Sequence, residues 1–318
     1  MLYQKTVSVV VPAYNEEKLI GRVIGTMPSF VDLIIVIDDN CSDKTSIRAK
    51  EAAKKFHRKL EIIKHKVNQG VGGSVLDGFA LASKRKMYVS AVMAGDAQMA
   101  PEELKGVITP ILKNEADFVK GNRIASGKAW TLMPKIRYLG NSFLSLLTKI
   151  SSGYWHVADS QTGYVAISKE MINRIPLEKV AKGYGFENDI LIYLNVKSAR
   201  VKEVAVTPVY GIGEKSGMLL IKVGPEIAWL LFRRFFWRLG VKYVVEDFHP
   251  LVFFYLASIF LNISSLGLFV RLIIKLSQTG SFPIMNTILF VFCAIMASQF
   301  LFFAMWFDMD YNKDLKVK

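Results

Sequence analysis

Side chains able to bind a polar ligand follow three short apolar runs of the 318-residue sequence. They are Pro12, Tyr14 and Glu16 after the first run, Asp39 after the second, and Asp96 with Gln98 after the fourth. In an open sheet of parallel strands, ligands bind beyond the carboxyl ends of the strands. We therefore expect the three sets to face one crevice.

The chemistry of these side chains points to a cation and a phosphate group. Carboxylate and amide oxygens are hard ligands that suit Mg²⁺ or Mn²⁺, which keeps its other positions for phosphate and water. A single carboxylate at a strand end could instead cap a helix. Only the convergence of the three sets favours a binding site.

The strands that would position these groups are apolar, β-branched runs that end in turn residues, as buried parallel strands do. They cover residues 6–11, 33–37, 61–64 and 88–93. Helical patterns lie between and after them, at 16–26, 42–56, up to 83 and 101–113. This alternation predicts an α/β fold with a mostly parallel sheet. The glycine-rich stretch 69–73 lacks the lysine of a P-loop and is expected to be a tight turn.

The pattern becomes less regular after residue 120. A helix is expected at 135–150, a turn followed by a strand within 158–167, and a further strand at 201–206. No internal repeat is visible in the periodicity.

Two long segments near the C-terminus predict membrane helices. Residues 251–270 and 276–307 contain no charged side chain, and each segment reaches the ~20 residues that a helix needs to cross a bilayer. We expect spans at about 250–271 and 284–307, with Arg271 and Lys275 in the connecting turn. The chain would then be an integral membrane protein.

Charge and the N-terminal sequence predict its orientation. The first residues lead directly into a strand pattern without a signal peptide. The flanks of the spans carry more lysine and arginine than the connecting turn, and basic flanks face the cytoplasm. A hairpin with both ends and the large domain in the cytoplasm is expected.

Residues 217–248 combine basic residues with tryptophan and phenylalanine, which is typical of helices lying in a membrane interface. An ordinary core helix is the alternative, because amphipathicity does not separate the two. The net charge is +14, but no nucleic-acid recognition motif is present. Attraction to anionic lipid headgroups explains the charge better, and we expect no nucleic-acid partner.

The remaining signals are weak. Cys41 and Cys293 lie far apart, which indicates neither a disulfide framework nor a zinc site, and the four histidines show no metal-ligand spacing. Self-association through Gly267, Ser264 and Ser265 of the first span is open, since small residues are common in spans.

Together the motifs resemble those of family-2 glycosyltransferases, which have the GT-A fold of nucleotide-diphospho-sugar transferases, with a Rossmann-like, mostly parallel sheet. The resemblance rests on VPAYNE at 11–16 and on Asp38–Asp39 followed by DKT at 43–45. Within the family, the polyprenyl-phosphate glycosyltransferases of the dolichyl-phosphate mannose synthase group are most similar. Four further motifs carry that similarity: GNR at 121–123, DSQTG at 159–163, GFE at 185–187 and YGIGEKS at 210–216.

The resemblance implies roles on the donor side. Pro12, Tyr14, Glu16 and Asp39 would hold the base and ribose of a nucleotide. Asp96 would bind the metal that bridges the diphosphate, with Gln98 assisting. The family often has Asp-X-Asp here, whereas this chain has Ala94 in place of the first acid. The missing carboxylate leaves the identity of the metal open.

The resemblance also implies roles on the acceptor side. Arg123 and Arg137 would grip the acceptor phosphate, since guanidinium groups make bidentate contacts, and Lys215 would add charge from a mobile loop. Asp159 is a candidate for positioning the acceptor or the sugar, as is Glu187.

The sequence thus predicts a catalytic domain at 1–216, interfacial helices at 217–248 and a transmembrane hairpin with a short tail at 249–318. The expected activity is metal-dependent, inverting transfer of a hexose from GDP-mannose, UDP-glucose or UDP-N-acetylglucosamine to dolichyl or polyprenyl phosphate. One alternative is transfer to a hydroxyl of a lipid-linked or polymeric glycan, for which Asp159 or Asp189 would be the base. Another is a non-catalytic membrane protein that binds a nucleotide sugar.

Overall fold

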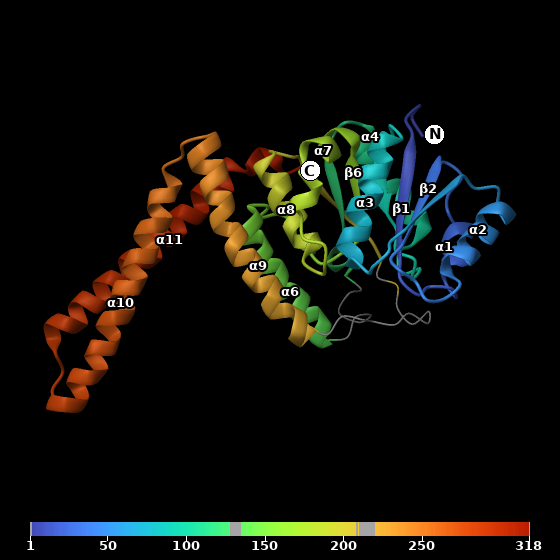
Figure 1. Cartoon of the computed structure of the whole chain (residues 1–318). Coiled ribbons are helices and arrows are strands. Elements are labelled where there is room, and N and C mark those ends of the chain that lie inside the picture. The colour runs from blue at the N-terminus through green and yellow to red at the C-terminus, as the bar shows by residue number, and fades with distance from the viewer. Residues whose placement is uncertain (1, 128–134, 208, 210–219, 318) are drawn as a thin grey trace. The chain divides into compact units, whose positions relative to one another are not determined.

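The computed structural model describes residues 2–127, 135–207, 209 and 220–317 (Figure 1). The chain divides into two compact units. The first contains Met1–Phe235 and Asp314–Lys318, and the second contains Phe236–Lys313.

A seven-stranded sheet forms the centre of the first unit, in the order β3-β2-β1-β4-β6-β5-β7. The strands are β1 (Val7–Ala13), β2 (Leu33–Asp38), β3 (Leu60–Lys64), β4 (Val89–Val92), β5 (Phe118–Asn122), β6 (Val165–Ser168) and β7 (Val201–Ala205). Only β6 is antiparallel to its neighbours in this sheet, pairing with β4 and β5. The mostly parallel sheet that the sequence predicts is confirmed.

Helices cover both faces of the sheet (Figure 1). The helices α1 (Ile20–Gly25), α2 (Thr45–Lys55) and α4 (Leu104–Leu112) share one buried apolar cluster with Val7, Val9 and Val11 of β1. The helix α3 (Gly70–Lys84) lies on the opposite face, where a Cβ on Gly78 would come within 2.2 Å of Val10 Cγ1. Alternate residues of β1 thus face the two helical layers, as the twofold repeat of a strand requires.

Four further helices belong to the part of the chain after β5. They are α6 (Lys135–Ser152), α7 (Lys169–Arg174), α8 (Phe186–Val196) and α9 (Leu220–Gly240). The structure differs from the sequence-based expectation in two places here. The short α7 and the buried α8 were not predicted, and residues 70–73 form the first turn of α3 rather than a separate turn. Glycines are compatible with that turn because loop 181–186 packs directly on it.

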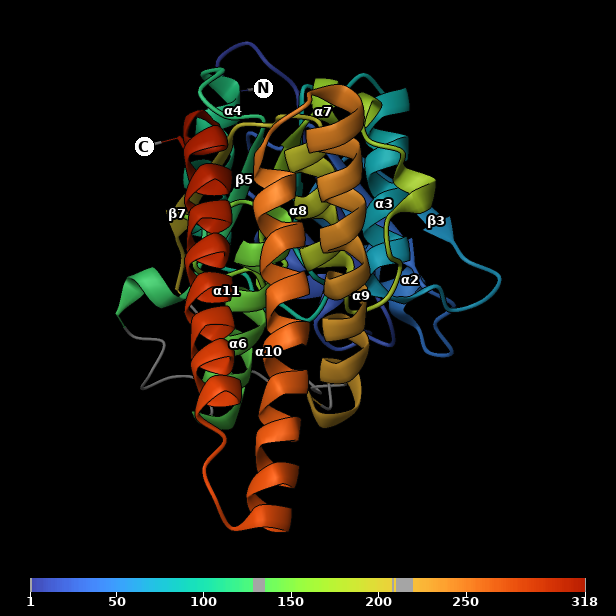
Figure 2. The same cartoon turned by 90° about the vertical axis from the view of Figure 1, so that its left-hand side faces the viewer.

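The second unit contains two long helices, α10 (Leu251–Thr279) and α11 (Ile284–Tyr311), which lie side by side (Figure 2). Both are long and apolar enough to cross a membrane, and about four-fifths of the most apolar part of each is not buried. The sequence-based position of Arg271 and Lys275 was wrong, because both lie inside α10 and not in the connecting turn. A helix can continue through such residues because their long side chains reach toward polar surroundings.

Candidate active site

The carboxyl ends of β1, β2 and β4 border a cavity of about 390 Å³. Five residues singled out from the sequence line it, namely Pro12, Tyr14, Glu16, Asp39 and Asp96. The parallel register of the three strands brings their ends to one edge, and the first turn of α3 and loop residues Gly183 and Tyr184 complete the wall. The structure thus brings residues of all three sets to one cavity, although Gln98 is not among the residues that line it.

Asp39 is anchored in this cavity by the start of α3. Its carboxylate is buried and accepts hydrogen bonds from the backbone N–H groups of Gln69 at 2.8 Å and Gly70 at 2.9 Å. Gly70 has a φ of +82°, which a residue with a side chain rarely adopts. The glycine therefore lets the chain turn so that two successive N–H groups point at one carboxylate.

Asp96 lies in a tight turn after β4. Its Oδ1 accepts the backbone N–H of Gln98 at 3.0 Å, so the two residues proposed as metal ligands are linked through the main chain. Among the described residues, no group of three or more His, Cys, Asp or Glu side chains could hold a metal ion. The residues present fit an ion that takes most of its ligands from phosphate and water, which is the usual mode for Mg²⁺.

Glu16 lies near a second negative charge, that of Asp96, in the same cavity. Burial raises its pKa to about 7, and the charges of Asp96 and Asp43 contribute to the rise. Two neighbouring carboxylates disfavour each other's ionised form, and a cation between them would stabilise both charges. The electrostatics of the cavity therefore suit a divalent ion brought in with a nucleotide.

A substitution of Glu16 should show the cost of ionising this buried carboxylate. The pKa of Glu16 in the folded protein is raised above the ordinary value of 4.5. The contribution of the Glu16 side chain to the free energy of unfolding is therefore fully present below pH 4.5 and is lost as the pH rises through about 7. We expect Glu16→Gln to raise the unfolding temperature of protein free of metal and nucleotide at pH 7.5, and to raise it much less at pH 5.

Differential scanning fluorimetry in EDTA measures both values. The matched control is Glu17→Gln, because the Glu17 carboxylate accepts the Lys44 N–H and lies one residue along the chain. An equal change at the two pH values would contradict the interpretation.

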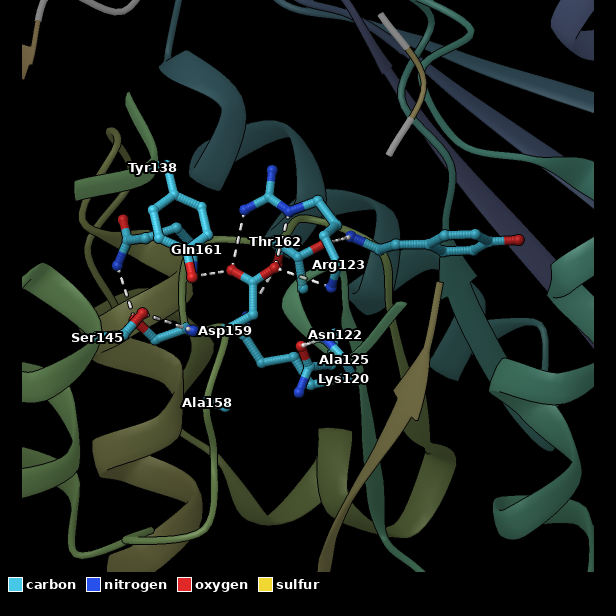
Figure 3. Close-up of polar contacts among 12 residues, drawn as sticks. Lys120, Asn122, Arg123, Ala125, Tyr138, Ser145, Ala158, Asp159, Gln161 and Thr162 are labelled. Carbon is cyan, nitrogen blue, oxygen red and sulfur yellow. Dashed lines mark hydrogen bonds and ion pairs between the residues drawn. The ribbon is translucent and has the colours of Figure 1, made fainter. Parts of the chain in front are cut away.

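A second polar cluster lies at the same edge of the sheet, around Arg123 and Asp159 (Figure 3). The strand β5 runs parallel to β7 and antiparallel to β6, which is itself antiparallel to β4. The carboxyl end of β5, and the loop that leads into β6, therefore come to the edge where β1, β2 and β4 end. The Tyr164 hydroxyl donates to the carbonyl of Ala100 at 3.0 Å, which joins that loop to the chain following Asp96.

Asp159 is bound to Arg123 at three points. The Arg123 Nε lies 2.7 Å from Oδ2, Nη2 lies 2.9 Å from Oδ1, and the Arg123 backbone N–H donates to Oδ2 at 3.1 Å. Burial pushes the pKa of Asp159 upward, but the Arg123 charge and hydrogen bonds outweigh it and the pKa lies below its usual value. Asp159 is therefore suited to hold Arg123 in place and poorly suited to accept a proton.

Sequence reasoning missed Lys120, which is fully buried beside this pair. Its Nζ donates to the carbonyl of Thr162 at 2.8 Å (Figure 3). Burial lowers the pKa of Lys120 to about 8, although the charges of Glu187 and Asp159 oppose the fall. A lysine inside the apolar run of β5 is the signal that could have found it, since lysine is seldom buried without partners.

Asp189 forms a separate pair that reaches α9. Its carboxylate is buried, lies 2.7 Å from Arg234 Nε and accepts the Ala181 N–H at 2.8 Å. Burial raises the pKa of Asp189, while the Arg234 charge opposes the rise. Oδ2 also accepts a hydrogen bond from Arg234 Nη2 at 3.0 Å, and the pair attaches α9 to α8.

Two predicted site residues cannot be placed. Arg137 belongs to α6, but its side chain lies outside the described part of the structure, and Lys215 lies outside the described residues altogether. Their roles stay predictions, as does the loop closure suggested for Lys215.

The family model described as glycosyl transferase family 2 matches residues 8–175. The chain is 31% identical over 218 residues to the UDP-N-acetylglucosamine–dolichyl-phosphate N-acetylglucosaminyltransferase of Methanococcus voltae, covering 65% of this chain and 86% of that protein. It is 29% identical over 206 residues to the dolichol-phosphate mannosyltransferase of Pyrococcus furiosus, covering 63% of this chain and 56% of that protein.

Among solved structures, glucosyl-3-phosphoglycerate synthase of Mycobacterium tuberculosis, crystallised with Mg²⁺ and UDP, is similar with a TM-score of 0.53. The match covers 75% of this chain and 80% of that chain at 21% sequence identity. At that identity the similarity concerns the fold. Together with the mostly parallel sheet, it confirms the predicted fold class.

Proposed function

Because this chain belongs to glycosyl transferase family 2, we propose that it transfers a hexose, with inversion, from a nucleotide sugar to dolichyl or another polyprenyl phosphate. The names of the relatives from Methanococcus voltae and Pyrococcus furiosus, both dolichyl-phosphate enzymes, support this class of acceptor. The donor sugar is not fixed by them, since one name specifies N-acetylglucosamine and the other mannose.

The observation that carries the proposal is the three-point contact of Arg123 with Asp159 (Figure 3). A sugar hydroxyl acceptor needs a base, because its proton must leave. The two acids that would serve as base, Asp159 and Asp189, are each bound to an arginine and a backbone N–H. A lipid phosphate is already an anion near neutral pH and needs no base. It therefore suits a site in which both candidate bases are paired with arginines.

The reaction we propose is a direct displacement. An oxygen of the lipid phosphate forms a bond to the anomeric carbon of the sugar while the bond from that carbon to the diphosphate oxygen breaks. The nucleoside diphosphate leaves, and the configuration at the anomeric carbon inverts. Arg123, held by Asp159, would orient the acceptor phosphate, and Arg137 and Lys215 would add positive charge.

On the donor side, Asp39, Tyr14, Pro12 and Glu16 would hold the nucleoside. Asp96 and Gln98 would hold Mg²⁺ or Mn²⁺, which when bound neutralises charge on the departing diphosphate. Asp96 and Gln98 would supply only part of the shell of such an ion, and phosphate and water would supply the rest.

We further propose that α10 and α11 cross the membrane as a hairpin and that α9 lies in its cytoplasmic interface. Trp229 and Phe232 of α9 stack on each other and are more than half exposed, as are Leu139 and Phe143 of α6. The C-terminal tail supports a hairpin, since the Val317 N–H donates to the carbonyl of Val201 at the edge of the first unit.

A screen of donors and acceptors tests the function. Purified protein in detergent is mixed with Mn²⁺ or Mg²⁺, with labelled UDP-N-acetylglucosamine, UDP-glucose or GDP-mannose, and with either dolichyl phosphate or dolichol. We expect label to enter the lipid phase with dolichyl phosphate and one preferred donor, and not with the free alcohol.

The same screen separates the alternatives. Transfer to the alcohol or to an added glycan, but not to the lipid phosphate, would overturn the proposed acceptor. Nucleotide binding without transfer under any condition would leave the chain a non-catalytic binding protein.

A further inference from the structure

A buried imidazole lies next to Asp39 at the edge of the donor cavity. His65 follows β3 directly, and its backbone N–H donates to the carbonyl of Asp38 at 2.9 Å. Its side chain is 5% exposed. Nδ1 lies 2.8 Å from Asp39 Oδ1, and Nε2 lies 3.1 Å from Asp77 Oδ2. The ring is hydrogen-bonded to Asp39 through Nδ1 and only lies near Asp77, so it would act on a ligand through Asp39.

The hydrogen bonds of Asp39 show what the imidazole adds. Oδ1 accepts from His65 and from the Gln69 N–H, and Oδ2 accepts from the Gly70 N–H. An ionised carboxylate has about four acceptor positions, so the remaining one belongs to Oδ2. With Oδ1 bound twice, the carboxylate cannot rotate without breaking bonds. Oδ2 is thus held ready for a donor N–H in the cavity that Asp39 lines.

The other side of the ring faces the Asp77 carboxylate. Asp77 is carried by α3, and its Oδ2 also lies 3.4 Å from Gln69 Nε2. The Gln69 side chain accepts from Lys182 Nζ at 2.9 Å, in the loop that packs on the first turn of α3. These contacts connect the ring to two segments that line the cavity.

We propose that His65 is a positioning residue that fixes Asp39 for recognition of the donor base. The base would be one with a ring N–H beside a carbonyl, as in uracil or guanine. This inference rests on the proposed function, since it requires that Asp39 contacts the nucleotide. The Nδ1 proton directed at Asp39 carries the effect.

A pair of substitutions separates the two nitrogens. Asparagine places its amide N where Nδ1 lies in histidine, whereas glutamine reaches toward the position of Nε2. We expect His65→Asn to keep the KM for the donor within about threefold of the wild type. His65→Gln should raise that KM about tenfold or more, because a hydrogen bond to a buried charged group is lost.

In both variants kcat at saturating donor should stay within about twofold, since a contact to the base serves ground state and transition state equally. A merely structural role of His65 would instead lower kcat through loss of active enzyme. Thermal unfolding of each variant verifies folding. If His65→Gln does not fold, His65→Leu, which fills similar space without a donor, replaces it in the comparison with His65→Asn.

Binding of UDP, GDP and ADP with Mn²⁺, followed by calorimetry, completes the test. Wild-type protein should bind UDP or GDP and discriminate against ADP, and Asp39→Asn should lose that binding. Suppose that the wild-type protein binds a nucleotide and that Asp39→Asn loses this binding. If His65→Asn and His65→Gln (or His65→Leu) then have the same KM for the donor, the role of His65 is refuted while the proposed function stands. If the wild-type protein binds none of the three nucleotides, both fail together.

Discussion

Replacement of Asp96 by asparagine should lower the rate of sugar transfer by about 10²–10³-fold, the usual cost of removing one electrostatic contact to a transition state. Asparagine keeps the size of the side chain and an oxygen that can accept the Gln98 N–H, so the turn after β4 is preserved. Only the negative charge is lost. Because Ala94 stands where the family often has its first acid, no neighbouring residue of that motif replaces the charge.

Two measurements check this expectation. Transfer of label to dolichyl phosphate reports turnover, and titration of UDP or GDP with and without Mn²⁺ reports how much the ion adds to nucleotide affinity. We expect Asp96→Asn to lose the part that depends on Mn²⁺. Glu102→Gln, an exposed acid six residues further along, serves as the control and should change neither value. Unchanged Mn²⁺ dependence in Asp96→Asn would remove Asp96 from the metal site.

Arg238→Ala should destabilise the second unit by about 3–5 kcal/mol, because it leaves a buried charge without its partner. Arg238 and Asp308 are both fully buried, with Nη1 2.8 Å from Oδ1 and Nη2 3.0 Å from Oδ2. Tyr243 donates to the same carboxylate, and the Asn312 side chain donates to Tyr243 Oη at 2.8 Å. The network joins the end of α9 to α11 through the π-helical turn Val241–Glu246.

Thermal and denaturant unfolding in detergent measure this cost. The double variant Arg238→Met with Asp308→Leu should recover much of the loss, since a buried ion pair can often be replaced by apolar residues of similar size. The matched control is Lys313→Ala, which breaks an ion pair with Asp310 at 3.0 Å on the surface of the same unit. It should change stability by no more than about 1 kcal/mol. A loss in Arg238→Ala as small as in this control would contradict a structural role for the pair.

Local sequence signals were sufficient to locate the cavity at the carboxyl ends of β1, β2 and β4. The strands that carry Asp39 and Asp96 are short β-branched runs that end in turn residues, and parallel pairing brings such ends together without further information. The same reasoning located the two long apolar helices, whose composition alone predicts their length to within a few turns. The sequence placed the start of α3 imprecisely, because glycine-rich stretches usually form turns. Here loop 181–186 packs against the glycines, which lie in the first turn of the helix.

The pairing of the charges depends on the fold. His65 reaches Asp39 across 26 residues, Arg123 reaches Asp159 across 36, and Arg238 reaches Asp308 across 70. The energy of such a pair depends on distance and on burial, and neither can be read from the residue types or their spacing. The residue types and their spacing therefore indicate which chemical groups lie at the edge of the sheet. Folding determines which of the acids is held by an arginine and which lines the cavity.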